Sequence, residues 1–153
     1  MSDYTPDYGR RIVVDLGFES TLGQVNLALR EEGLCALARI DVRDHLMREQ
    51  RHMFRQYEII EAWSPDLAVE TLGSHLDAGI VLPTRFALYE LADGETAVLA
   101  SEPMAPMAAH PQWRADFPAL AAAADREAER VARVLARVQQ HSRAPARTAS
   151  ASI

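Results

Sequence analysis

The sequence of 153 residues contains no lysine, and all sixteen basic residues are arginine. Without a lysine amine the chain cannot form a Schiff base, attach pyridoxal phosphate or place a P-loop lysine on a nucleotide. Cysteine is almost as scarce, because Cys35 stands alone and no disulfide can form within the chain. Since Cys35 lies between Leu34 and Ala36 in an apolar segment, we expect a buried and inert thiol.

Long apolar segments are also missing. There is no run of about 18 apolar residues, and the N-terminal segment MSDYTPDYGRR has no apolar core of a secretory signal. The net charge of −6 gives no electrostatic footprint for nucleic acid. We therefore expect no membrane partner, no nucleic-acid partner and a cytoplasmic location.

What the chain does contain is typical of one globular domain, with 48% apolar and 25% charged residues. We expect an N-terminal arm at residues 1–7, a single domain at residues 8–141 and a disordered tail at residues 142–153. The tail, SRAPARTASASI, is too poor in large apolar residues to bury a core.

Alternating apolar residues predict five strands, and residues at helical spacing predict three helices and one short polar helical turn. The strands are expected at 11–16, 34–42, 57–63, 80–91 and 96–101, the turn at 44–52, and the last, long helix at 117–141. This order predicts an α+β fold in two layers, with a curved, mainly antiparallel five-stranded sheet packed on helices.

Local signals place the ends of several elements. Gly33 is expected to end the first helix as a C′ glycine, and Ser64 to cap the second helix with Pro65 at its first position. Pro83 implies an edge or a bulge in the fourth strand. The dipeptide at 93–94, Asp-Gly, indicates a two-residue hairpin.

Four short motifs follow one another in a characteristic order. They are FRQY at 54–57, SPDLA at 64–68, LP at 82–83 and EPMAPM at 102–107. This order resembles the FRPY, NPPLA, LLPC and DPEAM segments of the family called "domain of unknown function 302", found in small bacterial and archaeal proteins. The resemblance extends over residues 8–138 and implies a fold like that of the TATA-binding protein, but no activity.

One departure from that family is informative. Many members carry a cysteine just before the Asn-Pro and another after the Leu-Pro, whereas Trp63 and Thr84 stand at these positions here. Thiol or thiolate-metal chemistry therefore does not carry over from such relatives, and we expect no thiolate-bound metal.

Two carboxylates are candidates for a site. By helical angle Glu127 lies on the apolar side of the last helix, where a carboxylate must find a donor, reach solvent or have a raised pKa. An arginine such as Arg85 would oppose that shift. Glu61 shares one face of the third strand with Trp63. With Arg85 on a nearby strand, these residues could line a small pocket, or the face could be an aromatic dimer surface.

Histidine and methionine give weaker signals. His45 and His52 are seven residues apart, roughly 10 Å along a helix, too far to bind one metal ion together, and we expect both to be solvated. Met104, Met107 and His110 could form a soft copper(I) site, although packing beneath a loop is the commoner role of such methionines. We expect no metal site and no cofactor.

The last helix also carries an arginine stripe, which consists of Arg126, Arg130, Arg133 and Arg137. A solvated face with local pairs from Glu129 to Arg133 and from Glu127 to Arg130 is one interpretation. A rim that binds an anion or a partner is the other.

Two functions remain open. The first is a homodimeric accessory protein that associates through its sheet surface and binds a small molecule at Glu61, Trp63, Arg85 and Glu127. The alternative is a small enzyme in which Glu127 or Glu61 acts as acid or base while arginines hold an anionic substrate. The sequence does not decide whether the chain is an enzyme.

Overall fold

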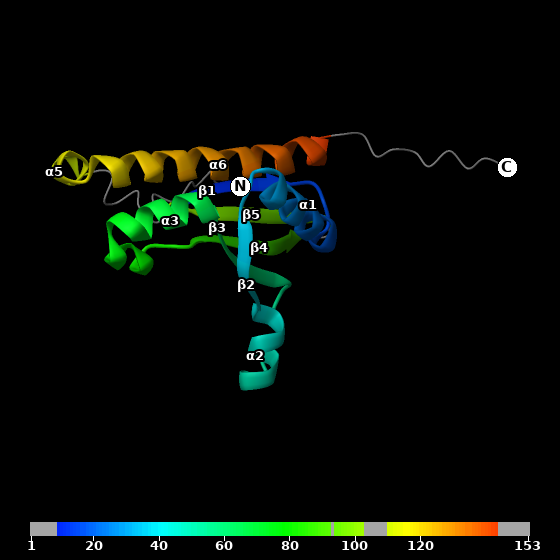
Figure 1. The fold of residues 1–153 in the computed structure, drawn as a ribbon. Coiled ribbons are helices and arrows are strands. Elements are labelled where there is room, and N and C mark those ends of the chain that lie inside the picture. Colours follow the sequence, from blue (N-terminus) through cyan, green and yellow to red (C-terminus); the bar gives the residue numbers. More distant parts are fainter. Residues whose placement is uncertain (1–8, 93, 103–109, 144–153) are drawn as a thin grey trace.

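The computed structural model describes residues 9–92, 94–102 and 110–143 (Figure 1). The predicted N-terminal arm at 1–7, Asp93 of the hairpin, and residues 144–153 of the predicted tail lie outside these residues. The elements are β1 (Gly9–Val14), α1 (Phe18–Glu31), β2 (Cys35–Asp41), α2 (Val42–Gln50), β3 (Tyr57–Trp63), α3 (Pro65–Ser74), the 3₁₀ helix η1 (Leu76–Ile80), β4 (Thr84–Ala92), β5 (Glu95–Ser101), α5 (Pro111–Asp116) and α6 (Pro118–Arg143).

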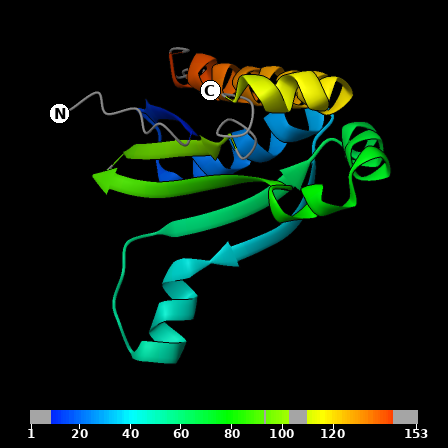
Figure 2. The same ribbon diagram turned by 90° about the vertical axis from the view of Figure 1, so that its left-hand side faces the viewer.

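The five strands form one sheet in the order β1-β5-β4-β3-β2, and every neighbouring pair is antiparallel. The helices α1, α3 and α6 gather along one side of this sheet, while α2 projects from its β2 edge, away from α6 (Figures 1 and 2). The predicted two-layer α+β fold, with its antiparallel sheet and long C-terminal helix, is therefore confirmed.

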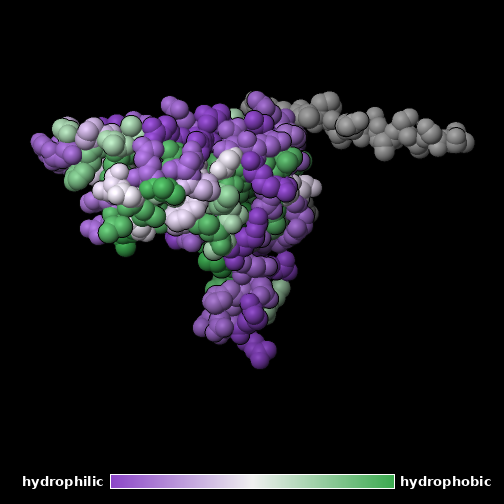
Figure 3. All heavy atoms as spheres, in the orientation of Figure 1, coloured by the Kyte–Doolittle hydropathy of each residue, from purple (hydrophilic) through white to green (hydrophobic). Residues whose placement is uncertain are grey.

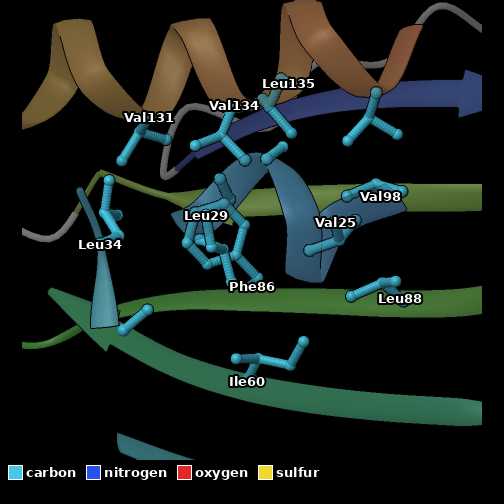
Figure 4. Packing of buried hydrophobic residues seen from close by; sticks show 14 of the residues in the cluster. Val25, Leu29, Leu34, Ile60, Phe86, Leu88, Val98, Val131, Val134 and Leu135 are labelled. Atoms are coloured by element: carbon cyan, nitrogen blue, oxygen red, sulfur yellow. The ribbon is translucent and has the colours of Figure 1, made fainter. Parts of the chain in front are cut away.

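The core lies between the sheet and these helices. Every second residue of β3, β4 and β5 points toward α1 and α6, and Ile60, Phe86 and Val98 have no exposed surface. Figure 4 shows Val25 and Leu29 of α1 pointing toward the same strands, with the valines of α6 above them. The alternation predicted from the sequence thus selects the residues that fill the core.

Gly33 ends α1 as predicted. Its backbone has a φ of +77°, a left-handed conformation that glycine adopts without the steric cost of a Cβ. The amide of Gly33 donates to the carbonyl of Arg30, and the amide of Leu34 donates to that of Leu29 at 2.8 Å. This Schellman motif turns the chain from α1 directly into β2.

The fourth strand begins later than predicted, at Thr84 instead of residue 80. Residues 76–80 form η1, and Pro83 precedes the strand. The expected edge or bulge at Pro83 is wrong because β4 is a central strand, and a proline outside the strand removes no ladder hydrogen bond.

The prediction that Cys35 is buried is wrong. β2 is an edge strand of which every residue is exposed, Cys35 included. Its alternation of apolar and polar residues ends at Asp41, which caps α2 by accepting a hydrogen bond from the amide of Asp44 at 2.9 Å. We call residues 42–56 the α2 projection, and no residue of its helix is buried.

The C-terminal helix was predicted almost correctly. α6 runs to Arg143, so Ser142 is helical and accepts a hydrogen bond from the amide of Asp15 at 2.9 Å. The predicted start of the tail, at residue 142, is therefore at least two residues too early. The short helix α5 was not predicted, because a six-residue helix is too short to show a periodic apolar pattern.

Candidate functional site

The strongest candidate site lies where β3 passes into α3 beneath α6. Ser64 occupies the N-cap of α3 with Pro65 next to it, as predicted, but its hydroxyl makes no capping hydrogen bond. That side chain is fully buried. A buried hydroxyl that leaves the helix end uncapped is available to a group other than the helix amides.

The side chain of Glu127, from α6, lies next to this hydroxyl. The residue is only 9% exposed, so the sequence-based placement on the apolar side of the helix is correct. Both carboxylate oxygens of Glu127 and the Oγ of Ser64 lack a hydrogen-bond partner among the residues that the structure describes. Buried polar atoms are nearly always paired, so three unpaired acceptors in one place are unusual.

The pKa of Glu127 is raised, first of all because burial disfavours the charged carboxylate. The nearby hydroxyl and amide of Ser64 and the charge of Arg130 lower this pKa, although neither Ser64 group meets hydrogen-bond geometry. Asp66 raises it slightly further. Arg85 plays no part, so the expectation that it opposes the shift is wrong.

Glu127 and Ser64 border a small cavity of about 10 Å³. Its other walls include Trp63, Leu67, Thr71 and Leu82. A cavity of this size holds about one water-sized particle. The chemistry of the cavity is therefore a carboxylate and hydroxyls at one water-sized position, with apolar side chains around it.

The other predicted pair lies elsewhere. Glu61 and Arg85 are directly opposite each other on β3 and β4, and Arg85 Nη2 donates to Glu61 Oε1 at 2.7 Å. They alternate with Ile60 and Phe86 of the core, so they lie on the face of the sheet away from α6. The four predicted site residues thus form two groups, Glu61 with Arg85 and Glu127 with Trp63.

Trp63 and Thr84, the two positions at which the family resemblance implied cysteines, lie at neighbouring strand ends. Ala62 of β3 pairs with Thr84, the first residue of β4, and Trp63 is the last residue of β3. Thr84 is 1% exposed, and its hydroxyl has no hydrogen-bond partner in the described part of the chain. Of the two side chains, the indole of Trp63 borders the Glu127 cavity.

The arginine stripe of α6 forms ion pairs between helices. Its pairs are Arg126 with Glu70 at 2.6 Å, Arg130 with Asp66 at 2.9 Å, Arg133 with Glu32 at 2.7 Å, and Arg137 with Glu31 at 2.9 Å and Glu32 at 2.6 Å. The local pairs expected with Glu129 and Glu127 are replaced by these contacts. The stripe joins α6 to α1 and α3, so its charges are already balanced and the anion-binding rim is not supported.

Two larger hollows are more open to solvent than the Glu127 cavity. One, of about 400 Å³, lies between the α2 projection and the start of α1 and is lined by Glu19, Asp41, Asp44 and Glu58 among others. Burial raises the pKa of Glu58. The second, of about 510 Å³, is bordered by Arg30, Cys35 and Arg39.

The remaining sequence candidates do not assemble. His45 and His52 are both exposed, as predicted. Met104 and Met107 lie outside the described residues, and His110 is exposed at the start of α5. In segments 9–92, 94–102 and 110–143, no three His, Cys, Asp or Glu side chains are grouped so that they could hold a metal ion.

Sequence reasoning missed Ser64 as a site residue because it assigned that side chain a capping role. A serine between a strand and a proline is an ordinary N-cap in sequence, and only its burial beneath α6 distinguishes it. Thr71 of α3 is also buried and forms a wall of the cavity.

The family model for "Domain of unknown function DUF302" matches residues 11–138. The chain belongs to this family. The crystal structure of an uncharacterized conserved DUF302 protein from Bacillus stearothermophilus is similar, with a TM-score of 0.68 and 21% sequence identity. The similarity covers 89% of this chain and 98% of that one and supports the shared fold. No curated protein matches the sequence. Among the described helices of this DUF302 protein, none is long and apolar enough to cross a bilayer.

Proposed function

We propose that this DUF302 protein is a homodimeric accessory protein that binds a small molecule. The single observation that carries the proposal is the apolar character of the sheet face opposite the helices. The helices α1, α3 and α6 all pack on the other face, and no described helix lies across this one. We call it the open face.

The open face is apolar at its centre. One row of cross-strand neighbours runs from Leu99 through Ala87 and Ile59 to Ile40. In the next row Tyr57 stacks on Tyr89, with ring centres 5.3 Å apart and planes 11° from parallel. An apolar centre of this extent, with charged residues toward its margins, is typical of a protein–protein contact.

A second copy of the chain is the partner that the charges favour. The whole chain carries a net charge of −6, so two copies repel each other over most of their surfaces. The open face instead carries two arginines, Arg11 and Arg85, and two glutamates, Glu61 and Glu95, which balance. In a two-fold dimer each patch meets itself, and a neutral patch is the one that does so without repulsion.

The area is also adequate for a dimer. Five strands about 4.8 Å apart and six residues long give a face of roughly 500 Å² in projection. The nine-residue helix of the α2 projection adds roughly 130 Å² beyond the β2 edge. Side-chain relief brings this sum near the roughly 800 Å² per partner that stable complexes bury.

The small-molecule part of the proposal rests on the Glu127 cavity.

The enzyme alternative has less support from the geometry. Glu61 is neutralised by Arg85, and Glu127 faces a cavity that admits only a water-sized group. An acid or base must reach the reacting atom within hydrogen-bond distance, which so small a cavity denies to most substrates.

The dimer is tested by matched isoleucine substitutions. Ile40 lies on the open face and is 44% exposed, whereas Ile80 in η1 is 91% exposed and far from it. Sedimentation equilibrium should show a micromolar dimer that Ile40→Arg weakens at least about tenfold, since it places a charge against an apolar partner surface. Ile80→Arg should leave the dimer unchanged. A monomeric wild type, or equal effects of the two substitutions, would contradict the proposal.

The same dimer can be measured a second way. Cys35 is the single cysteine and is exposed, so a spin label attaches there alone. A defined inter-label distance that disappears in Ile40→Arg is expected. A distance that persists in that variant would place the contact elsewhere.

A further inference from the structure

We propose that the Glu127 cavity binds the ammonium group of a primary amine. The inference rests on the small-molecule part of the proposed function and names the chemical class of that ligand. Three acceptor atoms carry it: the two carboxylate oxygens of Glu127 and the Oγ of Ser64. All three are buried, and none has a partner in the part of the chain that the structure describes.

The number of acceptors matches the number of donors on an ammonium group. An –NH₃⁺ group has three N–H donors and no acceptor, so it can give one hydrogen bond to each of the three oxygens. A water molecule can donate to the two carboxylate oxygens and accept from the Ser64 hydroxyl, so the number of hydrogen bonds alone does not exclude water. Water leaves the buried negative charge uncompensated, however, whereas ammonium neutralises it.

The size of the cavity selects the same group. An ammonium group is about as large as a water molecule, and the cavity of about 10 Å³ has room for one such particle. The planar guanidinium group of arginine is larger. Since the chain contains no lysine, its own side chains supply no ammonium group.

The neighbouring positive charges are already engaged. Arg130 gives two hydrogen bonds of 2.9 Å to Asp66, and Arg126 gives one of 2.6 Å to Glu70. Within the described residues Glu127 forms no ion pair, although the charge of Arg130 acts on it from the same helix. The Glu127 carboxylate is therefore available to bind a cation from outside the chain.

The cavity walls indicate where the remainder of the ligand lies. Trp63 and Leu82 are only partly buried, while Leu67 and Ala68 behind them are buried. The carbon chain of an amine would leave the cavity past Trp63 and Leu82 and cover their apolar surface. An alkylamine should consequently bind more tightly than the ammonium ion alone.

The test uses full-length protein in buffer free of Tris and ammonium, with thermal unfolding as the readout. Ammonium chloride and butylamine hydrochloride are titrated, with sodium chloride and tetramethylammonium chloride as controls for ionic strength and size. The first two should raise Tm in a saturable manner, because a ligand that binds only the folded state stabilises it. The two control salts should not.

Matched substitutions assign the effect to the cavity. Glu127→Gln should lower the apparent amine affinity at least about tenfold, because it removes the charge that strengthens these hydrogen bonds. Ser64→Ala, which removes one acceptor, should lower it by a smaller factor. Glu129→Gln makes the same charge change at an exposed position of α6 and should bind like wild type.

Several results would overturn the inference. One is a Tm that responds to ammonium and butylamine no more than to sodium chloride. Another is unchanged affinity in Glu127→Gln. Equal responses to ammonium and butylamine would also overturn it, because they would assign the cavity to the free ammonium ion. A stronger response to butylamine would support an amine with an apolar chain. A copurified ligand without an amine, bound at Glu127, would overturn this inference and leave the proposed function standing.

Discussion

The two faces of the sheet place similar glutamates in opposite situations. On the covered side Glu127 lies among apolar side chains and makes no hydrogen bond within the described residues, and burial raises its pKa. On the open face Glu61 has an arginine at 2.7 Å and a side chain that is 27% exposed. One carboxylate is buried without a hydrogen-bond partner among the described residues, and the other is paired with an arginine.

This contrast separates a carboxylate paired at the surface from a carboxylate buried without a hydrogen-bond donor. A carboxylate that is paired at the surface contributes little to stability and has little tendency to bind a further group, because its partner and the solvent already satisfy its hydrogen bonds. A carboxylate buried without a donor keeps a strong demand for a proton or a cation. Ligand-binding sites are therefore expected where the fold buries a polar group without a hydrogen-bond partner.

The largest expected difference between the faces is in packing. Phe86→Ala, on the covered face, should lower the free energy of unfolding by about 3–5 kcal/mol because it opens a cavity in the core. Ile59→Ala, on the open face, should lower it by less than about 1.5 kcal/mol. Urea denaturation at several protein concentrations measures both. Equal losses at every concentration would show that the open face is as tightly packed as the core.

The next difference concerns Glu127 and pH. Because burial raises its pKa, the folded chain holds this proton more tightly than the unfolded chain does. The resulting stability is complete below the unfolded pKa, near 4.5, and is lost as the pH rises through the folded-state pKa. Glu127→Gln cannot ionise and should be more stable at neutral pH, by on the order of 1 kcal/mol, in amine-free buffer.

Stability curves measured from about pH 4 to about pH 8 check the sign. Glu129→Gln is the control and should keep the wild-type curve. A loss of stability in Glu127→Gln at neutral pH would mean that the carboxylate is satisfied in solution by a group outside the described residues.

The smallest expected effect compares two ion pairs. Hydrogen bonds from Arg133 and then Arg137 lower the pKa of Glu32, so its stability is present above the unfolded pKa and is lost as the pH falls through the folded-state pKa. In the monomer, at protein concentrations below the Kd of the proposed dimer, Glu32→Gln should cost about 1 kcal/mol at neutral pH, and Glu61→Gln on the open face only a few tenths. Both costs should shrink in high salt. The cost of Glu61→Gln should rise at concentrations that form the dimer, because the proposed dimer buries this pair. A monomer in which Glu61→Gln costs more than Glu32→Gln would contradict the expected order.

The sequence predicted most of the fold because its strongest signals are local. Alternation predicted a strand at residues 57–63, and Gly33 marked a helix end that adopts a left-handed conformation. The helical angle of Glu127 placed this residue on the apolar side of the last helix, where the structure buries it. Each of these signals depends on periodicity or on one backbone conformation.

The failures depend on neighbours far along the chain. Cys35 lies in an apolar segment but on an edge strand, and the sequence does not reveal which strand is the edge. Arg85 and Glu127 were joined in one site because nothing local shows that they point to opposite faces. The buried hydroxyl of Ser64 could not be foreseen either, since its role depends on α6, some sixty residues away.

The sheet order has a consequence for synthesis of the chain. The first strand pairs with the last, Arg11 beside Leu99, and Arg137 of α6 bonds to Glu32, which lies 105 residues earlier. At the usual rate of translation, β1 remains unpaired for several seconds before β5 exists. Contacts between such distant segments also slow folding itself. The nascent chain consequently presents an unpaired first strand until β5, which ends at Ser101, has been made, and this interval is when it most needs protection from aggregation.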